Sequence, residues 1–561
     1  MLMQRKNCSD LIGLLETRAS EMPEKPMYSF LDRRLECTTT FYYRAFFESA
    51  KQLAAVLQRT GLSRTPVLVL QPDPKEFVLS FWACVLAGAW PMPYVRPRGV
   101  RWQQIESVMK QSEMSAILTT SVVANLIPDE VLADIDLVLT DDASQDQAHW
   151  IRPRVEADDI AFIQYTSGST SNPKGVVITH RNILANLQAI HEAFSCSSED
   201  TGLSWLPLHH DMGLVGHVLE PCFAGIHNYF MRPADFVGNP SGWLEAIHRY
   251  RATISGGPCF AYALCLREQK NSELDLSCWR LAYCGSQKII TAVLQQFAES
   301  HVDNGFDPAA WFPCYGLAES TLFVGGVKGV HTRCVPGQGK LSIAIAADNR
   351  SHCQIRIVDP ITGLLCAEGK KGEIWIRSAS VSPGYYNNRE QNLTCFDQFV
   401  NGEGQYFRTG DLGFVCDGLL YFSGREKNLL KLRGRSIHGE DIESIVQHEV
   451  SDLGIAQCVV VPHSIDYDET FSLLVEWSER HRPAAVPSPR TIESKIRNLV
   501  CDTFSVFPHR ILFLPRGTLP LTTSGKPART ACLALLEQYL ESEQEQRAAG
   551  GRQQTGVLAH G

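Results

Sequence analysis

Short apolar runs alternate with segments of helical periodicity through about the first 420 residues of this 561-residue chain. The runs that predict strands occupy residues 66–70, 159–165, 354–359 and 373–377. The segment 181–194 predicts a helix, because apolar side chains recur at helical spacing at Ile183, Leu184, Leu187 and Ile190. Alternation of this kind predicts an α/β fold in which helices cover β-sheets.

A change in composition comes at residues 424–436, which are basic and punctuated by glycine. Beyond this stretch, strands are predicted at 456–462 and 472–477 and a helix at 491–500. A chain of this length is also too long for one hydrophobic core. We therefore expect a large domain over 1–425, a small α+β domain over 426–543 and a disordered tail over 544–561.

Composition and charge exclude several classes of protein. The net charge of −9 argues against a nucleic-acid surface, which needs a basic excess. The 18 cysteines include no C-x-x-C pair, which favours free thiols in a reducing cytosol over zinc ligands. We find no signal peptide, and the most apolar run, 77–90, is too short to cross a bilayer. A soluble, cytoplasmic protein is expected.

The segment YTSGSTSNPKG, residues 165–175, has the composition of a phosphate-binding loop. Its glycines allow backbone amides to converge on an anion, and its hydroxyl groups and lysine add further donors. It is not the P-loop of nucleoside triphosphatases, because Pro173 and Gly175 flank the lysine. A strand is expected before it and a helix after it, and a polar surface turn is the alternative. The expected phosphate contacts are Thr166, Ser167, Gly168, Ser169, Thr170 and Lys174.

The order of residues in this loop resembles that of the adenylate-forming enzymes, the superfamily of acyl-CoA synthetases, luciferases and nonribosomal-peptide adenylation domains. Four further segments resemble motifs of that superfamily and follow in its order: YGLAE (315–319), YFRTGDLG (406–413), GREKNLLK (424–431) and PLTTSGKPAR (520–529). The resemblance covers the chain except its tail. It implies ATP as a substrate and Mg²⁺ as a cofactor.

An adenylating enzyme must bring a carboxylate against the α-phosphate of ATP, so cations must offset the repulsion between two anions. By resemblance, Lys526 bridges the two groups and Glu319 holds Mg²⁺. The structural alternatives are an exposed lysine and a salt-bridged glutamate. The other nucleotide contacts that the resemblance implies are Gly285, Ser286, Tyr315 and Gly316, with Tyr315 facing the adenine, and Asp411 and Arg425 near the ribose.

In this superfamily the small domain rotates between two half-reactions, and by position the hinge is Lys427. One orientation would bring Lys526 to the site for adenylation. The other orientation would bring residues 432–436 to the site for transfer of the acyl group to a thiol.

Two segments, SWLPLHHDMGLVG (204–216) and ISGGPCFAYALC (254–265), resemble the fatty acyl-AMP ligases most closely. That resemblance implies transfer of the acyl group to the phosphopantetheine thiol of a separate acyl carrier protein. It also implies that His210 lies near the acyl carboxylate and that the apolar 254–265 segment lines an acyl tunnel. The segment expected to restrain the small domain lies within 325–353.

Other interpretations stay open from the sequence. One is an acyl-CoA synthetase, and another is a catalytically silent module that binds an acyl chain or a nucleotide. A metal cluster formed by His209, His210, Asp211 and His217 is a weaker alternative. Three positions depart from the family pattern and mark a divergent member: Ser171 in the phosphate loop, Gln287 after the expected adenine contacts, and His438 near the expected path of the thiol.

Overall fold

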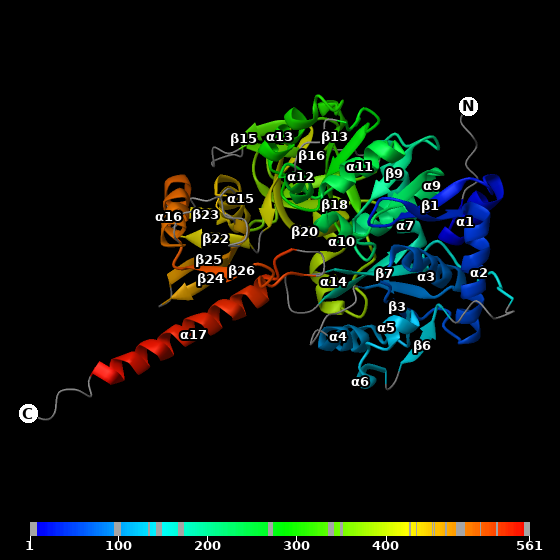
Figure 1. Cartoon of the computed structure of the whole chain (residues 1–561), viewed down its shortest axis with the longest axis horizontal. Helices are drawn as coiled ribbons and strands as arrows, with labels where there is room; N and C mark the ends of the chain where they lie inside the picture. The colour runs from blue at the N-terminus through cyan, green and yellow to red at the C-terminus, as the bar shows by residue number, and fades with distance from the viewer. Residues whose placement is uncertain are drawn as a thin grey trace, which may run out of the picture. The chain divides into compact units, whose positions relative to one another are not determined.

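The computed structural model (Figure 1) describes residues 8–94, 102–132, 135–141, 149–166, 173–267, 273–334, 341–347, 352–425, 428–432, 435–450, 453, 455–465, 468–477, 489–504, 506–522 and 526–554. The described residues form two compact units that divide after Ser423. The expected domain boundary, between residues 425 and 426, lies two residues further along the chain.

The larger unit contains an eight-stranded sheet in the order β14-β13-β12-β11-β9-β10-β1-β2. Its strands are β1 (Pro26–Leu31), β2 (Cys37–Tyr42), β9 (Thr201–Ser204), β10 (His227–Phe230), β11 (Ile254–Gly257), β12 (Leu281–Cys284), β13 (Trp311–Gly316) and β14 (Phe323–Gly326). The strands from β13 to β1 pair in parallel, while the edge strands β14 and β2 are antiparallel. Because parallel strands end at the same edge, the loops after β9, β11, β12 and β13 share one edge of this sheet.

A second, parallel sheet has the order β4-β3-β5-β6. Its strands are β3 (Pro66–Val69), β4 (Trp90–Pro93), β5 (Ala116–Thr119) and β6 (Asp136–Leu139). Helix α3 (Pro74–Ala87) follows β3 and is buried over most of its length. Asp73 caps its first turn by accepting a hydrogen bond from the Lys75 backbone, and Gly88 ends it at a φ of 74°.

The expected phosphate loop lies between two strands, β7 (Ile160–Thr166) and β8 (Lys174–Thr179), which pair as an antiparallel hairpin. The strand β8, which was not predicted, therefore separates the loop from the helix expected after it. The residues after Gly175 are β-branched, and such side chains favour a strand. The predicted helix over 181–194 is confirmed as α7 (His180–Ala193), which begins at a capping box formed by Thr179 and Asn182.

A third sheet is antiparallel, with the order β15-β16-β21-β20-β18-β17 and β19 paired to β20. Its strands are β15 (Thr332–Cys334), β16 (Leu341–Ala347), β17 (Gln354–Val358), β18 (Gly372–Arg377), β19 (Gln398–Val400), β20 (Glu403–Cys416) and β21 (Leu419–Arg425). The strands predicted at 354–359 and 373–377 are thus confirmed. The described parts of 325–353 include β15 and β16, and a restraining role for this segment stays a prediction.

The remaining helical elements of this unit are α1 (Leu11–Glu21), α2 (Tyr43–Arg59), α4 (Trp102–Ser112), α5 (Ser121–Ala124), α6 (Asp129–Leu132), α8 (Asp211–Leu214), the π-helix η3 (Val215–Leu219), α9 (Glu220–Ala224), α10 (Pro233–Gly238), α11 (Ser241–Tyr250), α12 (Cys259–Cys265), α13 (Thr291–His301), the short turns η4 (Pro308–Ala310) and η5 (Ala318–Ser320), and α14 (Arg389–Cys395). Helices α1 and α2 pack side by side (Figure 1).

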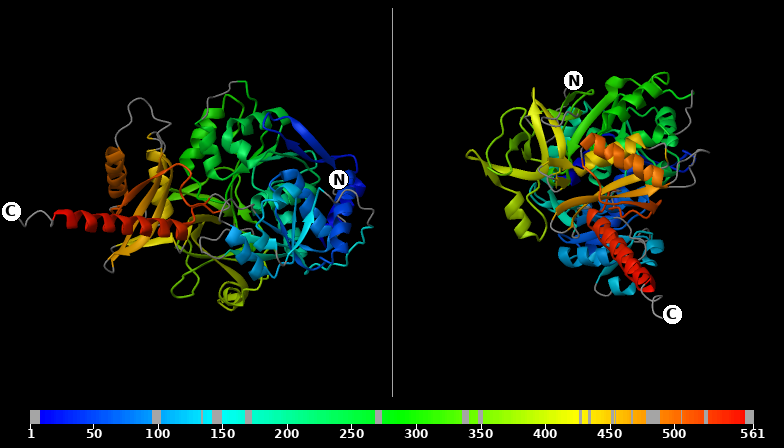
Figure 2. Two further views of the ribbon diagram at one scale, coloured as in Figure 1. Left: turned by 60° about the horizontal axis from the view of Figure 1, so that its bottom comes forward. Right: turned by 90° about the vertical axis from the view of Figure 1, so that its left-hand side faces the viewer.

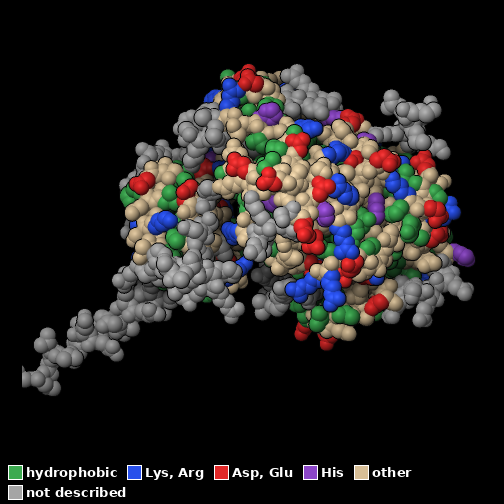
Figure 3. Space-filling view, turned by 45° about the horizontal axis from the view of Figure 1, so that its top comes forward, with side chains coloured by type: hydrophobic (Ala, Val, Ile, Leu, Met, Phe, Trp, Pro, Cys, Tyr) green, Lys and Arg blue, Asp and Glu red, His purple; other side chains and the backbone are tan. Residues whose placement is uncertain are grey.

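On the face shown in Figure 3, acidic and basic side chains of the described residues are interspersed rather than gathered by sign.

The smaller unit has a three-stranded sheet, β24 (Ile455–Ile465), β25 (Asp468–Trp477) and β26 (Ile511–Pro515), and a hairpin, β22 (Leu429–Leu432) and β23 (Arg435–His438). Its helices are α15 (Gly439–Glu449), α16 (Pro489–Phe504) and α17 (Arg529–Gln554). Figure 2 shows α17 extending away from the sheet of this unit.

Helix α17 continues past Glu543, so the expectation of a disordered tail from residue 544 is wrong as far as Gln554. Residues 541–549 are rich in Glu, Gln, Arg and Ala, which favour helix without a buried face. Residues 555–561 lie outside the described residues.

None of the helices in the described part of the chain combines the length and the apolar character of a membrane-spanning segment.

Two buried histidines and one half-buried histidine make the stability of the larger unit sensitive to acid. Burial lowers the pKa of His180, His217 and His227 to about 4 in each case, below the value of about 6.5 in an unfolded chain. The unfolded chain therefore binds protons first as the pH falls. The stability that these neutral side chains contribute is complete above pH 6.5 and is lost as the pH approaches 4.

We expect the free energy of unfolding to fall below about pH 6.5 by about 1.4 kcal/mol per pH unit for each of these histidines. Urea unfolding at neutral pH and at about pH 5, followed by tryptophan fluorescence, measures the difference. The variant His331→Asn, which removes an exposed histidine, should show the same pH dependence. A free energy of unfolding that stays constant over this range would contradict the assignment.

Candidate active site

The loops after β12 and β13 bring several of the predicted nucleotide contacts to one edge of the eight-stranded sheet. Gly285 directly follows β12, and Gly316 ends β13. Both positions require glycine, because an added Cβ would lie 2.8 Å from Sγ of Cys314 at Gly285 and 2.0 Å from the Leu322 carbonyl oxygen at Gly316. Ser286 adopts a φ of 66°, a strained backbone conformation for a residue with a side chain. The backbone therefore turns sharply where we expect the adenine, and the half-buried Gln287 follows this turn.

Tyr315 and Asp411 meet although they come from different sheets. The Tyr315 hydroxyl donates a hydrogen bond to Oδ2 of Asp411 at 2.6 Å, and both side chains are buried. Tyr315 lies on β13 and Asp411 lies on β20. The structure thus brings together the residues expected at the adenine and at the ribose.

A glutamate that the sequence analysis missed holds the turn before Asp411. The carboxylate of Glu373, which is 2% exposed, accepts hydrogen bonds from Arg408 at 2.9 Å, from the Gly410 backbone at 3.2 Å and from the Trp375 indole at 2.9 Å. Gly410 has a φ of 68°, which favours glycine. An acidic residue inside the apolar run of β18 was the available signal, since a buried carboxylate needs partners.

Glu319 lies in the short turn η5, which follows β13. Its Oε1 accepts a hydrogen bond from the Tyr385 hydroxyl at 2.7 Å. The next turn is strained: Thr321 has a φ of 67° and a ψ of −59°, and the Leu322 backbone donates to the Ser320 carbonyl at 2.7 Å. This is a γ-turn of the form with a positive φ at its central residue, which is rare for a β-branched residue. Strain of about 1–3 kcal/mol at such a position is typical of functional sites.

Lys174 begins β8, directly across the hairpin from Thr166. Its Nζ donates to Oε1 of Gln391 at 2.7 Å and lies over the ring of Tyr385, 4.7 Å from the centroid. Residues 167–172, which contain the predicted phosphate contacts Ser167, Gly168, Ser169 and Thr170 and the departure at Ser171, lie outside the described residues. Their roles stay predictions.

His210 caps the short helix α8, and its Nδ1 lies 2.5 Å from Oδ1 of Asp211. The preceding carbonyl of His209 accepts a hydrogen bond from the buried Gln164 side chain of β7 at 2.8 Å. This bond ties the His210 turn to the strand that leads into the expected phosphate loop. Proximity of His210 to an acyl carboxylate stays a prediction.

His217 belongs to the core. One ring nitrogen lies 2.9 Å from Oδ1 of Asn228, and the other lies 2.6 Å from the Tyr283 hydroxyl. In the described residues, the side chains close enough to share a metal ion are His191–Cys196–Glu220 and Glu368–Cys416–Asp417. The histidines around 209–217 therefore do not form the alternative metal cluster.

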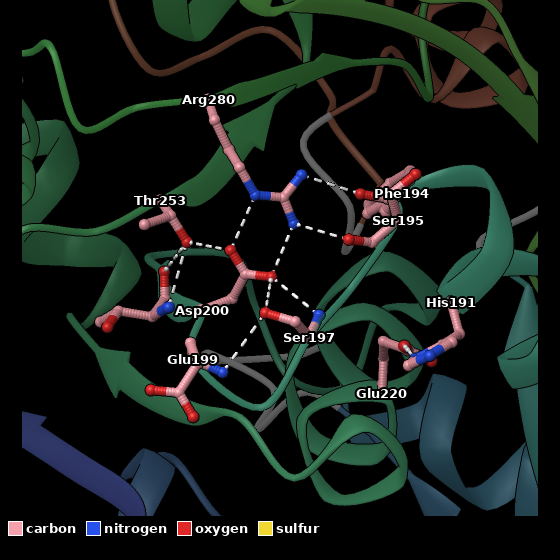
Figure 4. A network of polar contacts seen from close by, with 10 residues as sticks. His191, Phe194, Ser195, Ser197, Glu199, Asp200, Glu220, Thr253 and Arg280 are labelled. Atoms are coloured by element: carbon pink, nitrogen blue, oxygen red, sulfur yellow. Dashed lines mark hydrogen bonds and ion pairs between the residues drawn. The ribbon is translucent and has the colours of Figure 1, made fainter. Parts of the chain in front are cut away.

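A second polar network lies at the opposite edge of the sheet (Figure 4). Arg280 pairs with Asp200 at 2.7 Å and also donates to backbone carbonyls at the end of α7. The Thr253 hydroxyl donates to the same aspartate at 2.7 Å. These residues precede β12, β9 and β11, so they lie at the amino ends of the strands. The network joins the strands on the side away from the candidate site, and we assign it a structural role.

Helix α12 carries most of the segment expected to line an acyl tunnel. Tyr262 is fully buried and donates its hydroxyl to the Tyr283 carbonyl at 2.7 Å, so this face of the helix packs into the core. Phe260 is 40% exposed, and its ring centroid lies 6.0 Å from that of Trp205. The tunnel itself stays a prediction.

The remaining predicted residues belong to the smaller unit. The Thr522 hydroxyl accepts a hydrogen bond from the backbone of the half-buried Lys526 at 3.2 Å. His438 is fully buried, and an added Cβ at Gly424 would lie 2.3 Å from its Nδ1. Arg425 ends β21, and the expected hinge residue Lys427 lies outside the described residues.

A family model described as "AMP-binding enzyme" matches residues 15–386. The chain belongs to this family. Over 94% of its length it is 31% identical to a medium-chain-fatty-acid–[acyl-carrier-protein] ligase, JamA, of Moorena producens, of which 95% is covered. It is 30% identical, over 93% of this chain and 96% of the relative, to the long-chain-fatty-acid–AMP ligase FadD26 of Mycobacterium tuberculosis.

Solved structures agree with these relatives. A structure from a study of fatty acyl-adenylate ligases of E. coli and L. pneumophila has a TM-score of 0.85 and 28% identity, covering 96% of this chain and 99% of that one. The L. pneumophila fatty acyl-adenylate ligase with acyl adenylate and pyrophosphate has a TM-score of 0.73 and 29% identity, covering 94% and 96%. The resemblance to fatty acyl-AMP ligases is thus confirmed, and this AMP-binding enzyme is a ligase of the adenylate-forming type.

Proposed function

We propose that this enzyme activates a fatty acid with ATP to fatty acyl-AMP and passes the acyl group to the phosphopantetheine thiol of a separate acyl carrier protein. The observation that carries the proposal is the contact between Tyr315 and Asp411, with Glu319 one turn beyond Tyr315. This arrangement suits a nucleotide whose adenine lies at Tyr315, whose ribose lies at Asp411 and whose metal-bound phosphate lies at Glu319. Similarity to ligases named for fatty acids and an acyl carrier protein supports the choice of substrates.

The first half-reaction joins two anions. A carboxylate oxygen of the fatty acid attacks the α-phosphorus, and the bond from that phosphorus to the pyrophosphate oxygen breaks. Lys526 would stabilise the negative charge that develops between them, and Lys174 would hold the outer phosphates. Asp411 would accept the ribose hydroxyls, and His210 would lie near the acyl carboxylate.

In the second half-reaction, the thiolate sulfur of the carrier's phosphopantetheine attacks the acyl carbonyl carbon, and AMP leaves. Such a thioester is the form in which polyketide and lipopeptide assembly takes up an acyl chain, so we propose that setting.

Glu319 fits the magnesium ion that the family implies. Its carboxylate supplies the hard oxygen ligands that Mg²⁺ prefers, and it is half-buried in a turn fixed by Thr321. When bound, the ion would neutralise phosphate charge. The described cysteines form no disulfide, which supports a reducing compartment such as the cytoplasm as the site of the reaction.

With ATP, Mg²⁺ and fatty acids of graded chain length, we expect pyrophosphate release and accumulation of acyl-AMP. Added coenzyme A should give no acyl-CoA, whereas a carrier protein bearing phosphopantetheine should be acylated. Mass spectrometry of the products and of the intact carrier measures both outcomes. The same carrier without its phosphopantetheine is the control, and formation of acyl-CoA would favour an acyl-CoA synthetase instead.

A further inference from the structure

Tyr385 contacts two charged residues that the sequence motifs assign to different tasks. Its hydroxyl donates to Oε1 of Glu319 at 2.7 Å. The face of its ring receives Nζ of Lys174 at 4.7 Å from the centroid. The side chain is 5% exposed and packs edge-on against Phe396, with ring centroids 5.3 Å apart. One buried aromatic residue therefore touches the expected magnesium ligand and the expected phosphate-binding lysine.

The backbone around Tyr385 is bonded to both of the elements that carry these residues. Toward β8, the Val177 backbone donates to the Gly384 carbonyl at 3.0 Å, and the Tyr386 backbone donates to the Gly175 carbonyl at 2.7 Å. Toward η5, the Ser382 backbone donates to the Glu319 carbonyl at 2.8 Å. The segment 382–386 thus joins the strand that begins with Lys174 to the turn that holds Glu319.

Asn392 of α14 fixes Tyr385 from the other side. Its side-chain oxygen accepts from the Tyr385 backbone at 2.7 Å, and its side-chain nitrogen donates to the Tyr385 carbonyl at 2.9 Å. A Cβ added at Gly384, where φ is 151°, would lie 2.8 Å from the same amide. The tyrosine has little freedom to move, so the hydrogen bond from its hydroxyl sets the position of the carboxylate.

We propose that Tyr385 is a positioning residue that fixes the Glu319 carboxylate relative to Lys174, so that a metal ion and the phosphates it binds meet both at once. The proposal rests on the proposed function. A hydrogen bond from a buried phenol to a carboxylate holds one rotamer, and a metal ion then binds without first ordering its ligand. The aromatic face attracts the lysine ammonium without neutralising it, which leaves its charge available to phosphate.

The variant Tyr385→Phe keeps the ring and removes the hydroxyl. We expect the Mg²⁺ concentration for half-maximal ATP–pyrophosphate exchange to rise about tenfold, the change expected for one hydrogen bond to a charged group. The KM for the fatty acid and the melting temperature should stay close to those of the parent enzyme. Tyr386→Phe is the matched control, since the Tyr386 ring packs on Trp90, with centroids 6.3 Å apart.

Binding of Mn²⁺ in the presence of a non-hydrolysable ATP analogue, measured by electron paramagnetic resonance, tests the same point without catalysis. Tyr385→Phe should weaken Mn²⁺ binding about tenfold in the parent chain and have no further effect beside Glu319→Gln. Unchanged metal affinity, or an equal loss in both backgrounds, would overturn the proposal. A parent enzyme that shows no fatty-acid-dependent exchange would instead overturn the proposed function.

Discussion

Replacing Lys526 by alanine should lower fatty-acid-dependent ATP–pyrophosphate exchange by about a thousandfold. The ammonium would be the cation placed between the attacking carboxylate and the α-phosphate, where charge develops during reaction, and loss of such a group typically costs two to three orders of magnitude or more. The backbone at this position is held by Thr522, whose hydroxyl accepts from the Lys526 amide, so truncation of the side chain should leave the fold intact. Radiolabel exchange at saturating substrates measures the effect.

Lys495→Ala is the matched control, because it removes an exposed lysine on α16 of the same unit. It should leave exchange within about twofold of the parent rate. Lys526→Ala should still transfer the acyl group from supplied acyl-AMP, because the lysine is assigned to the first half-reaction alone. Exchange that survives the loss of Lys526 would show that another cation carries this step.

The second large effect is expected at Asp411. Asp411→Asn should raise the KM for ATP about a hundredfold, since a charged acceptor for the ribose hydroxyls contributes about 1.5–3 kcal/mol. Tyr315→Phe, which removes the 2.6 Å hydrogen bond to the same carboxylate, should have a smaller effect of the same kind. Steady-state kinetics with ATP and with 2′-deoxy-ATP measures both. The parent enzyme should prefer ATP, and the variant should lose that preference.

Asp417→Asn provides the comparison, because Asp417 directly follows the same strand, is exposed and pairs with Arg333. A surface ion pair of this kind contributes little, so its KM for ATP should be unchanged. If Asp411→Asn kept both the parent KM and the parent preference for ATP, Asp411 would be a structural residue of the turn that Glu373 holds.

The site depends on contacts between segments that are far apart in the chain. Asp411 and Tyr315 are 96 residues apart, and Glu319 and Tyr385 are 66 residues apart. Each pair is a short hydrogen bond between a phenol and a carboxylate. The first joins β13 of the eight-stranded sheet to β20 of the antiparallel sheet, and the second joins the turn η5 to the segment 382–386. Such bonds hold these segments together at the place where we expect the nucleotide.

The amino-acid sequence by itself determined the fold class, the strands near 354 and 373, the helix α7 and the membership of the AMP-binding enzymes. These features are encoded in local hydrophobic periodicity and in contiguous motifs such as residues 315–319 and 406–413. Both can be recognised without knowing which distant residues they contact. The sequence also contained β8, whose β-branched residues follow Gly175, but no strand was predicted between the loop and the helix at 181–194.

Only the tertiary structure decided that Tyr385 bridges Glu319 and Lys174 and that Glu373 holds the turn before Asp411. Neither residue belongs to a segment whose composition suggests chemistry. A tyrosine after a glycine and a glutamate in an apolar strand acquire their roles from the side chains that packing places beside them. Local sequence encodes backbone preference and periodicity, whereas hydrogen bonds between residues far apart in the chain exist only once the sheets have packed together.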